Sequence, residues 1–266
     1  MKDIERGLVK TSVGYLHYRA TGSGRPLVLM HVNGGSSTSY LELLEALPDN
    51  IRAVAVDYPG CGMSDHFEFE PTIHDYATVM AEFVKSLGLG KVTFLGQAGA
   101  GYVATELAVA FPEVTERIIM MSCPWYPDKA AQEAAHSGLA AVASSMEGAV
   151  PLPVSMEERL RRDPEHCPMI PSQLWADRKN VDAVLAGKDR SQLLRAFAAY
   201  DLAGNLPKVD VPAMNLWGEH FRYTRFQDEF AALVKYHRTT IIGGARIDPQ
   251  FDHPHEVAEA LVAFLG

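Results

Sequence analysis

The residues with the clearest chemical pattern are the glycine-rich run Gly-Gln-Ala-Gly-Ala-Gly at positions 96–101, which follows the strand-like run at 91–95. A G-x-S-x-G run between a strand and a helix forms a sharp turn that lifts a serine hydroxyl clear of a sheet, where it can attack a carbonyl. Here Ala98 stands at the serine position. Helically spaced apolar residues follow the turn and stop before Pro112, which predicts the helix that such a turn requires. The sequence therefore predicts the turn without its nucleophile.

The elements that would position this turn alternate along the chain. Apolar, β-branched runs predict strands at residues 8–18 (a hairpin turning near Val13 and Gly14), 26–31, 51–57, 91–95, 117–121, 212–217 and 239–242. Helical spacing predicts helices at about 39–47, 73–87, 99–111, 225–236 and 254–264. Strands that alternate with helices indicate a mostly parallel sheet covered on both faces.

Residues 122–207 break this alternation, because they contain no strand pattern and are rich in alanine, methionine, arginine and glutamate. We predict that they form a helical insertion. It would follow a sheet strand at the carboxyl edge, where open α/β sheets bind ligands, and so would roof a pocket. The chain is accordingly divided into a core of residues 1–121 and 208–266 and a helical cap of residues 122–207.

Composition excludes several classes of partner. The formal net charge is -9, and no cluster of lysine and arginine offsets it locally, so we expect no nucleic-acid binding. Three irregularly spaced cysteines, Cys61, Cys123 and Cys167, favour reduced thiols in the cytoplasm over a disulfide framework or a metal site. Residues 1–10 are charged, and no apolar stretch is long enough for a bilayer, so neither a secretory signal nor membrane binding is expected. No cofactor is expected either.

Four segments in order resemble the α/β-hydrolase superfamily, in the branch with a helical cap. Residues 27–35 (LVLMHVNGG) resemble a strand ending in an HG-type oxyanion loop, and residues 57–65 (DYPGCGMSD) are similar to the D-x-P-G-x-G-x-S-x turn. The third segment is the turn at 96–101, and the fourth joins 216–220 to the closing stretch 244–257. The resemblance implies an α/β-hydrolase fold: a mostly parallel eight-stranded sheet flanked by helices, with a helical cap inserted after strand 6.

The resemblance also implies where a catalytic triad would lie. A hydrolase of this type needs a serine to attack the carbonyl, a histidine to take its proton and a carboxylate to orient the imidazole. The serine position is Ala98, the acid position falls on Phe221, and the histidine position falls on Ile247. No residue of the standard catalytic type remains at these three positions. Three polar residues nearby are expected in a surface turn and at the start of the final helix: Asp248, Asp252 and His253.

Backbone donors would survive the loss of these side chains. The N–H groups of Asn33 and Gly99 would form the oxyanion hole, although Val32 stands where the family has glycine and restricts the backbone there. The candidate ligand-binding residues are His31, Val32, Gln97, Ala98, Cys123, Trp125, Phe221 and Ile247.

Each of these residues also has a structural interpretation. His31 is favoured as a brace for its loop over a base. Cys123 is either a thiol nucleophile or a small hydrophobe, and Gln97 either donates to a ligand carbonyl or satisfies nearby backbone. The apolar residues among these candidates either line a ligand pocket or fill the core.

Three functions fit these residues. The first is binding of a small, largely apolar or carbonyl-containing molecule by a receptor, carrier or regulatory pseudoenzyme. The second is a non-hydrolytic enzyme on the same scaffold, of lyase or decarboxylase type, working through an oxyanion site and desolvation. The third is a serine ester or lactone hydrolase whose triad has been replaced by engineering. We place binding first; the sequence leaves open whether the chain is a monomer or a homodimer.

Overall fold

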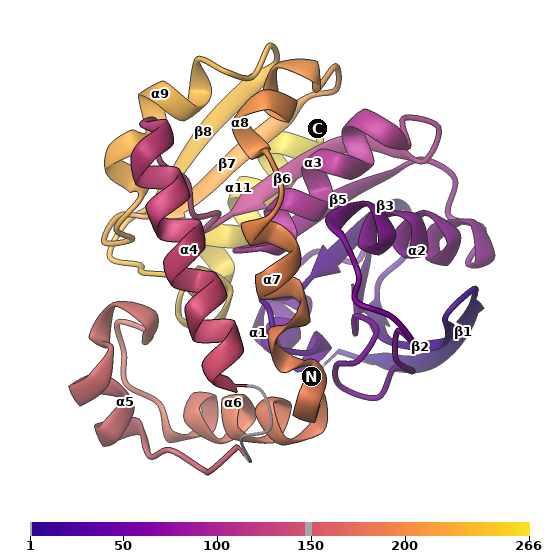
Figure 1. Ribbon diagram of the computed structural model, residues 1–266. Coiled ribbons are helices and arrows are strands. Elements are labelled where there is room, and N and C mark those ends of the chain that lie inside the picture. Colours follow the sequence, from indigo (N-terminus) through magenta and orange to yellow (C-terminus); the bar gives the residue numbers. More distant parts are fainter. Residues whose placement is uncertain (1, 147–150) are drawn as a thin grey trace.

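The computed structural model describes residues 2–146 and 151–266. Eight strands form one sheet in the order β1-β2-β4-β3-β5-β6-β7-β8. Their bounds are β1 Glu5–Thr11, β2 Gly14–Thr21, β3 Arg25–Met30, β4 Ile51–Val56, β5 Val92–Gln97, β6 Thr115–Met121, β7 Ala213–Gly218 and β8 His237–Ile242. β2 is antiparallel to both β1 and β4, whereas all other neighbouring strands are parallel. The predicted eight-stranded, mostly parallel sheet is therefore confirmed (Figure 1).

Helices cover both faces of this sheet. They are α1 Leu41–Ala46, α2 Ile73–Ser86, α3 Ala100–Ala110, α9 Gln227–Ala231, α10 Pro249–Asp252 and α11 Pro254–Leu265. Successive residues of a strand point to opposite faces, and β3 shows the consequence. Val28 and Met30 join the apolar cluster that includes α2 and α3, whereas Leu27 and Leu29 join the cluster that includes α1 and α11. The sheet thus separates two apolar cores.

Two helix boundaries show how local chemistry sets these elements. A capping box starts α2: the Thr72 side chain accepts from the N–H of Asp75, and the Asp75 side chain accepts from the N–H of Thr72. The helix predicted over 225–236 is shorter than expected and spans only Gln227–Ala231. After it, the N–H groups of Leu233 and Val234 make turn-type bonds three residues back, because the chain must already turn into β8.

The described residues after β6 form five helices and no strand until β7 begins. The helices are α4 Lys129–Met146, α5 Met156–Arg162, α6 Gln173–Ala186, α7 Gln192–Ala198 and α8 Leu202–Asn205, with a 3-10 turn at Gly187–Ser191 between α6 and α7. α4 and α7 run side by side in front of the sheet (Figure 1). In the described part of the chain, no helix is both long enough and apolar enough to cross a bilayer.

The three cysteines are unpaired and buried. Cys61 and Cys123 lie in the larger apolar core, whereas Cys167 lies in a small cluster with Met156, Trp175 and Ala176 in the cap.

Candidate functional site

The turn between β5 and α3 has the geometry that the sequence predicts. Ala98 adopts a left-handed backbone conformation with φ of 52°, and its N–H donates to the carbonyl of Met121 on β6 at 2.9 Å. A β-carbon at Gly96 would lie 2.1 Å from the carbonyl oxygen of Ala100, so only glycine lets the strand and helix approach this closely. The result is a sharp strand-to-helix turn, hereafter the elbow, with a methyl group at its apex.

Two further residues singled out by the sequence lie at the same edge of the sheet. Phe221 lies in the turn after β7, and Ile247 lies in the loop after β8. Both belong to the larger apolar core, and Ala98, Phe221 and Ile247 are all buried. Strands β5, β7 and β8 run parallel, so the residues that follow their carboxyl ends gather at one edge. The three positions therefore lie at one edge of the sheet, and all three carry buried hydrocarbon side chains.

The cap closes directly on the elbow through Phe197 of α7. A β-carbon at Gly99 would lie 2.6 Å from Cδ1 of Phe197, so this ring packs against the backbone of the first residue after Ala98. The Phe197 ring also lies 5.0 Å from the ring of Tyr102, measured between centroids. A large molecule above Gly99 would require this ring to move. Sequence analysis missed Phe197, because no motif marks which cap residue meets the elbow.

The loop after β3 carries one of the two expected backbone donors. Among the described residues, neither the N–H of Asn33 nor that of Gly99 has a protein acceptor. Val32 accepts a turn hydrogen bond from the N–H of Gly35 at 2.9 Å. Only Ala98 and Ser122 have positive φ among described residues other than glycine, so Val32 occupies an ordinary backbone region and is accommodated.

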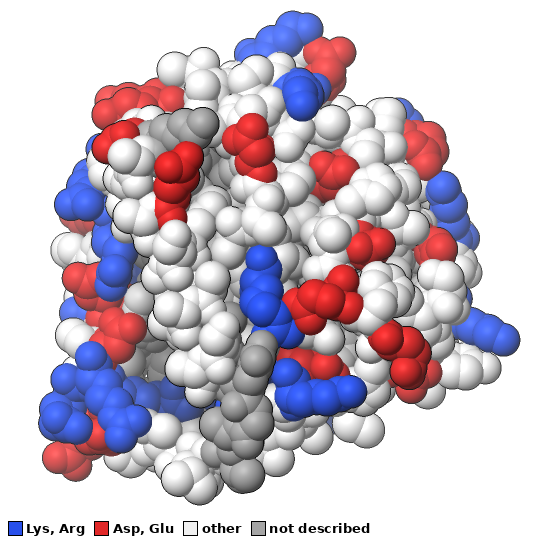
Figure 2. Space-filling model, viewed as in Figure 1, with Lys and Arg blue, Asp and Glu red and all other residues white. Residues whose placement is uncertain are grey.

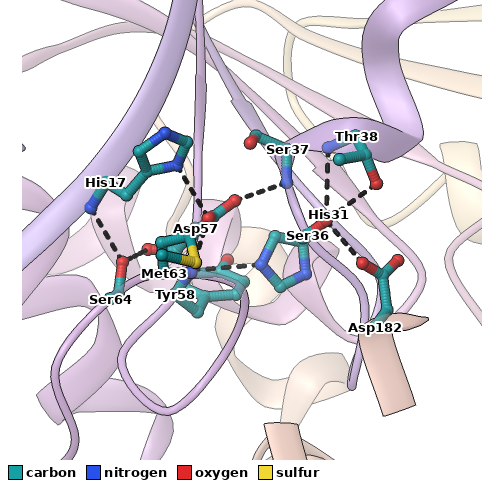
Figure 3. A network of polar contacts seen from close by, with 10 residues as sticks. All are labelled: His17, His31, Ser36, Ser37, Thr38, Asp57, Tyr58, Met63, Ser64 and Asp182. Atoms are coloured by element: carbon teal, nitrogen blue, oxygen red, sulfur yellow. Dashed lines mark hydrogen bonds and ion pairs between the residues drawn. The ribbon is translucent and has the colours of Figure 1, made fainter. Parts of the chain in front are cut away.

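His31 is fully buried, and both of its ring nitrogens are engaged. Figure 3 shows the contact with Tyr58. Nδ1 donates to the carbonyl of Val32 at 2.8 Å, and Nε2 accepts from the N–H of Tyr58 at 3.1 Å. These two partners fix the tautomer, and burial lowers the pKa of the ring, so the imidazole is neutral at pH 7. No ring atom is available to take a proton from a substrate.

A second buried histidine, His17, pairs with Asp57, and Figure 3 shows this network. His17 Nδ1 lies 2.8 Å from Oδ2 of Asp57, while the N–H groups of Ser37 and Met63 donate to the carboxylate at 2.6 and 3.0 Å. Burial opposes the charge, but these hydrogen bonds outweigh it and lower the pKa of Asp57. His17 is on β2, which β4 and β3 separate from β5, and the pair braces the loops after β3 and β4.

Asp248 is buried, and the expectation that it lies in a surface turn is wrong. Its Oδ2 accepts from Nε1 of Trp175 at 2.7 Å and lies 3.6 Å from Nζ of Lys179. Its Oδ1 accepts from the side-chain amides of Gln97 and, at 3.3 Å, Gln250. Both Trp175 and Lys179 belong to α6, so Asp248 fastens the cap to the core. We call these five residues the Asp248 latch.

Asp252 lies directly before the final helix, as expected, but its side chain is not at the surface. Asp252 is almost completely buried as a side chain; it accepts from the N–H of Met169 in the cap at 2.8 Å and pairs with His253. The missed signal is on α6, where Trp175, Lys179 and Asp182 share one face at helical spacing.

The amide of Gln97 is committed to the latch. The side chain is fully buried; besides Asp248, its Nε2 contacts the carbonyl of Ile247 at 3.3 Å, and its Oε1 accepts from Gln250 at 3.2 Å. This position joins the elbow to the residues after β8. The polar contacts of the site therefore lie where Gln97 meets Asp248 and Gln250.

Cys123 and Trp125 follow β6 and pack in the core. A β-carbon at Gly101 would lie 2.7 Å from Sγ of Cys123, and burial raises the pKa of this thiol, which holds it protonated. Trp125 packs edge-on against Phe230 at 5.3 Å between centroids. Among residues 2–146 and 151–266, no three His, Cys, Asp or Glu side chains are grouped so as to hold a metal ion.

The comparisons with known proteins agree with this fold. Over 258 residues the chain is 23% identical to the (E)-2-((N-methylformamido)methylene)succinate hydrolase of Acinetobacter baylyi, covering 94% of this chain and 93% of that protein. Over 118 residues it is 33% identical to haloalkane dehalogenase 2 of Mycobacterium tuberculosis, but the match spans only 44% of this chain and 41% of the dehalogenase.

Solved structures superpose over almost the full length. The enol-lactonase from Burkholderia xenovorans LB400 has a TM-score of 0.73 at 19% identity, covering 97% of this chain and 99% of that one. The epoxide hydrolase CorEH has a TM-score of 0.78 at 20% identity, covering 98% of each chain. A family profile described as "Alpha/beta hydrolase family" matches residues 27–260. The chain therefore belongs to the alpha/beta hydrolase family.

Proposed function

We propose that this protein is a non-hydrolytic member of its family that binds a small, largely apolar molecule carrying a carbonyl group. The observation that carries the proposal is Ala98: the backbone keeps the left-handed apex, with φ of 52°, but presents a methyl group. Such a conformation is unfavourable for a residue with a β-carbon. In a serine hydrolase this backbone conformation would expose the nucleophilic hydroxyl. The Ala98 side chain has no hydroxyl.

The surrounding residues support the absence of acyl transfer. That reaction needs a nucleophile, a base that takes its proton and a group that orients the base. The positions assigned to these roles hold Ala98, Phe221 and Ile247. Possible substitutes are already engaged: His31 uses both ring nitrogens, and the Cys123 thiol is held protonated in the core.

What the elbow offers is binding chemistry. The N–H groups of Asn33 and Gly99 have no protein acceptor in the described part of the chain, and N–H groups at such positions suit a carbonyl oxygen. Around them, apolar side chains favour a hydrocarbon body. Phe197 would move aside to admit it. Some relatives are named as hydrolases. This fits a protein that keeps the binding geometry of the fold without the catalytic side chains.

Hydrolysis can be tested directly with p-nitrophenyl butyrate. We expect the natural protein to show no rate above buffer. The triple variant A98S/F221D/I247H should gain activity, by about 10²-fold or more, because it restores a hydroxyl, a base and an orienting acid. Natural-protein hydrolysis that disappears in Ile247→Phe would refute the proposal, and so would carbon dioxide release from acetoacetate above the buffer rate.

Binding needs a probe that cannot be hydrolysed, and 2-heptanone combines a carbonyl with an apolar chain. We expect ligand-observed NMR to detect its binding and Ile247→Phe, which fills space beside the elbow, to weaken it about tenfold. Ile241→Phe is the matched control, because Ile241 is an exposed residue of β8. No binding, or equal weakening in both folded variants, contradicts the proposal.

A further inference from the structure

A cavity of about 490 Å³ is lined by residues of α4 on one side and of α7 and α8 on the other. Figure 1 shows where these three helices lie. This volume is within the range of small-molecule sites. The residues that line it include Tyr126, Gln132, Glu133, His136, Tyr200 and Asp201, but none of the elbow residues. Phe197 lies between the two places, since its ring contacts Gly99 and lies 6.5 Å from that of His136.

The polar wall of this cavity is held in one orientation. The N–H of Tyr126 donates to Oε1 of Gln132 at 2.9 Å, which fixes the direction of that amide. Gln132 Nε2 then donates to Oη of Tyr102 at 3.3 Å and to Nε2 of His136. His136 lies near the backbone of Ala198 on α7, and both residues line the cavity. The cavity is therefore a formed site between α3, α4 and α7.

The charged side chains that the structure describes in the lining are acidic. Asp201 and Glu133 supply carboxylates, and the described part of the lining contains no lysine or arginine. Burial lowers the pKa of His136, so this ring adds no positive charge at neutral pH. Figure 2 shows acidic side chains on the upper part of this face, with basic ones at its edges and also near its middle. The described carboxylates of the lining favour a cation over an anion.

Aromatic rings complete the lining. Tyr200 donates its hydroxyl to Glu106 at 2.8 Å, and burial raises its pKa, so it remains a neutral phenol. Tyr126 is held edge-on against Tyr223 at 5.0 Å between centroids. Alkylammonium groups are attracted both to aromatic faces and to carboxylates. Alanine and leucine side chains on α7 and α8 add an apolar part to the same wall.

We propose that this cavity binds an organic cation, an ammonium group attached to a small apolar or hydroxylated body. The two tyrosines and Asp201 would hold the ammonium, and the apolar wall would hold the body. This site is separate from the elbow and does not depend on what the elbow binds.

Choline and its neutral isostere 3,3-dimethyl-1-butanol test the role of charge. Titration calorimetry at pH 7.5 and low salt should show choline binding to the natural protein, with the alcohol at least tenfold weaker. Equal affinity for the two molecules would overturn the proposal, and so would no detectable binding of choline.

Two aspartate-to-asparagine substitutions test where choline binds. Asp201→Asn should weaken choline binding at least fivefold while preserving the fold, because asparagine can still cap α8 as Asp201 does through the N–H of Gly204. Asp210→Asn changes the net charge equally at an exposed residue paired with Lys235, and should leave affinity within twofold. If both variants weakened choline binding equally, the loss would reflect the net charge of the protein alone. That result would refute the site.

The ring contribution has its own pair of variants. Tyr200→Phe keeps the ring and should bind choline within about threefold of the natural protein, whereas Tyr200→Leu should lose at least fivefold. Ile247→Phe at the elbow should change nothing. Undiminished binding in folded Tyr200→Leu would contradict the assigned role of the aromatic wall.

Discussion

Two neighbours in sequence, Ile247 and Asp248, serve two different regions of the molecule. Ile247 belongs to the apolar surroundings of the elbow, whereas Asp248 is held by the latch on the other side of Gln97. At the elbow, the cap meets the core through the Phe197 ring, a contact that tolerates repacking. At the latch, directional hydrogen bonds to a buried carboxylate allow one arrangement only. The difference indicates that directional bonds fix α6 at the latch, whereas α7 meets the elbow through a packed ring and is tied to the core elsewhere by the Arg195–Glu70 ion pair.

The face of α6 that meets the core is unusually polar. Nη1 of Arg178 donates to both carboxylate oxygens of Glu42 at 2.8 Å, and Asp182 accepts from Oγ of Ser36 at 2.6 Å. On the same helix, Leu174, Val181 and Leu185 are exposed. Polar bonds therefore replace the apolar contact that usually docks a helix.

The largest effect is expected from Asp248→Ala. It would leave the buried donors of Trp175 and Gln97 without their acceptor and Lys179 without its partner, and should lower the free energy of unfolding by about 3 kcal/mol. Urea denaturation measures this loss. Asp210→Ala, at an exposed ion pair, should cost less than about 1 kcal/mol. Equal costs would show that the latch does not anchor the cap.

Lowering the pH should reduce the free energy of unfolding by less than Asp248→Ala does. Burial lowers the folded-state pKa values of His31 and His136 from 6.5, so the unfolded chain binds these protons first. Their contribution is present above pH 6.5 and is lost as the pH falls toward the folded values. Asp57, whose pKa is also lowered, adds a loss in stronger acid, whereas Asp182, whose pKa burial raises, partly offsets the loss.

Urea unfolding at pH 7.5, 6.0 and 5.0 checks the sign of this effect. His136→Gln should show a smaller drop than the natural protein over the same range, because one of the two histidines no longer titrates. Greater stability at pH 5.0 than at pH 7.5 would rule out the neutral histidines described above.

The smallest effect concerns the elbow itself. Ala98→Gly should raise the free energy of unfolding by about 1 kcal/mol, because glycine adopts the left-handed conformation without strain. Ala104→Gly, in the middle of α3, should lower it by about 1 kcal/mol or more. In urea denaturation of the two variants, the changes in the free energy of unfolding should have opposite signs. Destabilisation by Ala98→Gly would mean that the methyl group contributes packing that outweighs the strain.

Much of the fold could be predicted from sequence because the strands and most core helices carry local patterns. The elbow is encoded by Gly96 and Gly99 around Ala98, whose roles depend only on adjacent backbone and one approaching ring. Asp248 could not be placed, since a short acidic turn next to Pro249 is typical of surfaces. Only the docking of Trp175, 73 residues earlier in the chain, buries it.

The same reasoning applies to the cap as a whole. Its helical character follows from composition and from the lack of a strand pattern, but the side of each helix that meets the core cannot be predicted in this way. Phe197 and Asp182 acquire their roles only when α7 and α6 are packed against the loops after β5 and β3. Local sequence contains no information about such distant partners.

The buried thiols give the molecule an internal reporter of which part opens. Cys167 sits in the small cluster beside Trp175, while Cys61 and Cys123 lie in the larger core. An alkylating reagent would reach Cys167 when the cap lifts, and the other two only when the sheet itself comes apart. Peptide mass spectrometry over a labelling time course would then separate cap breathing from global unfolding without any added probe.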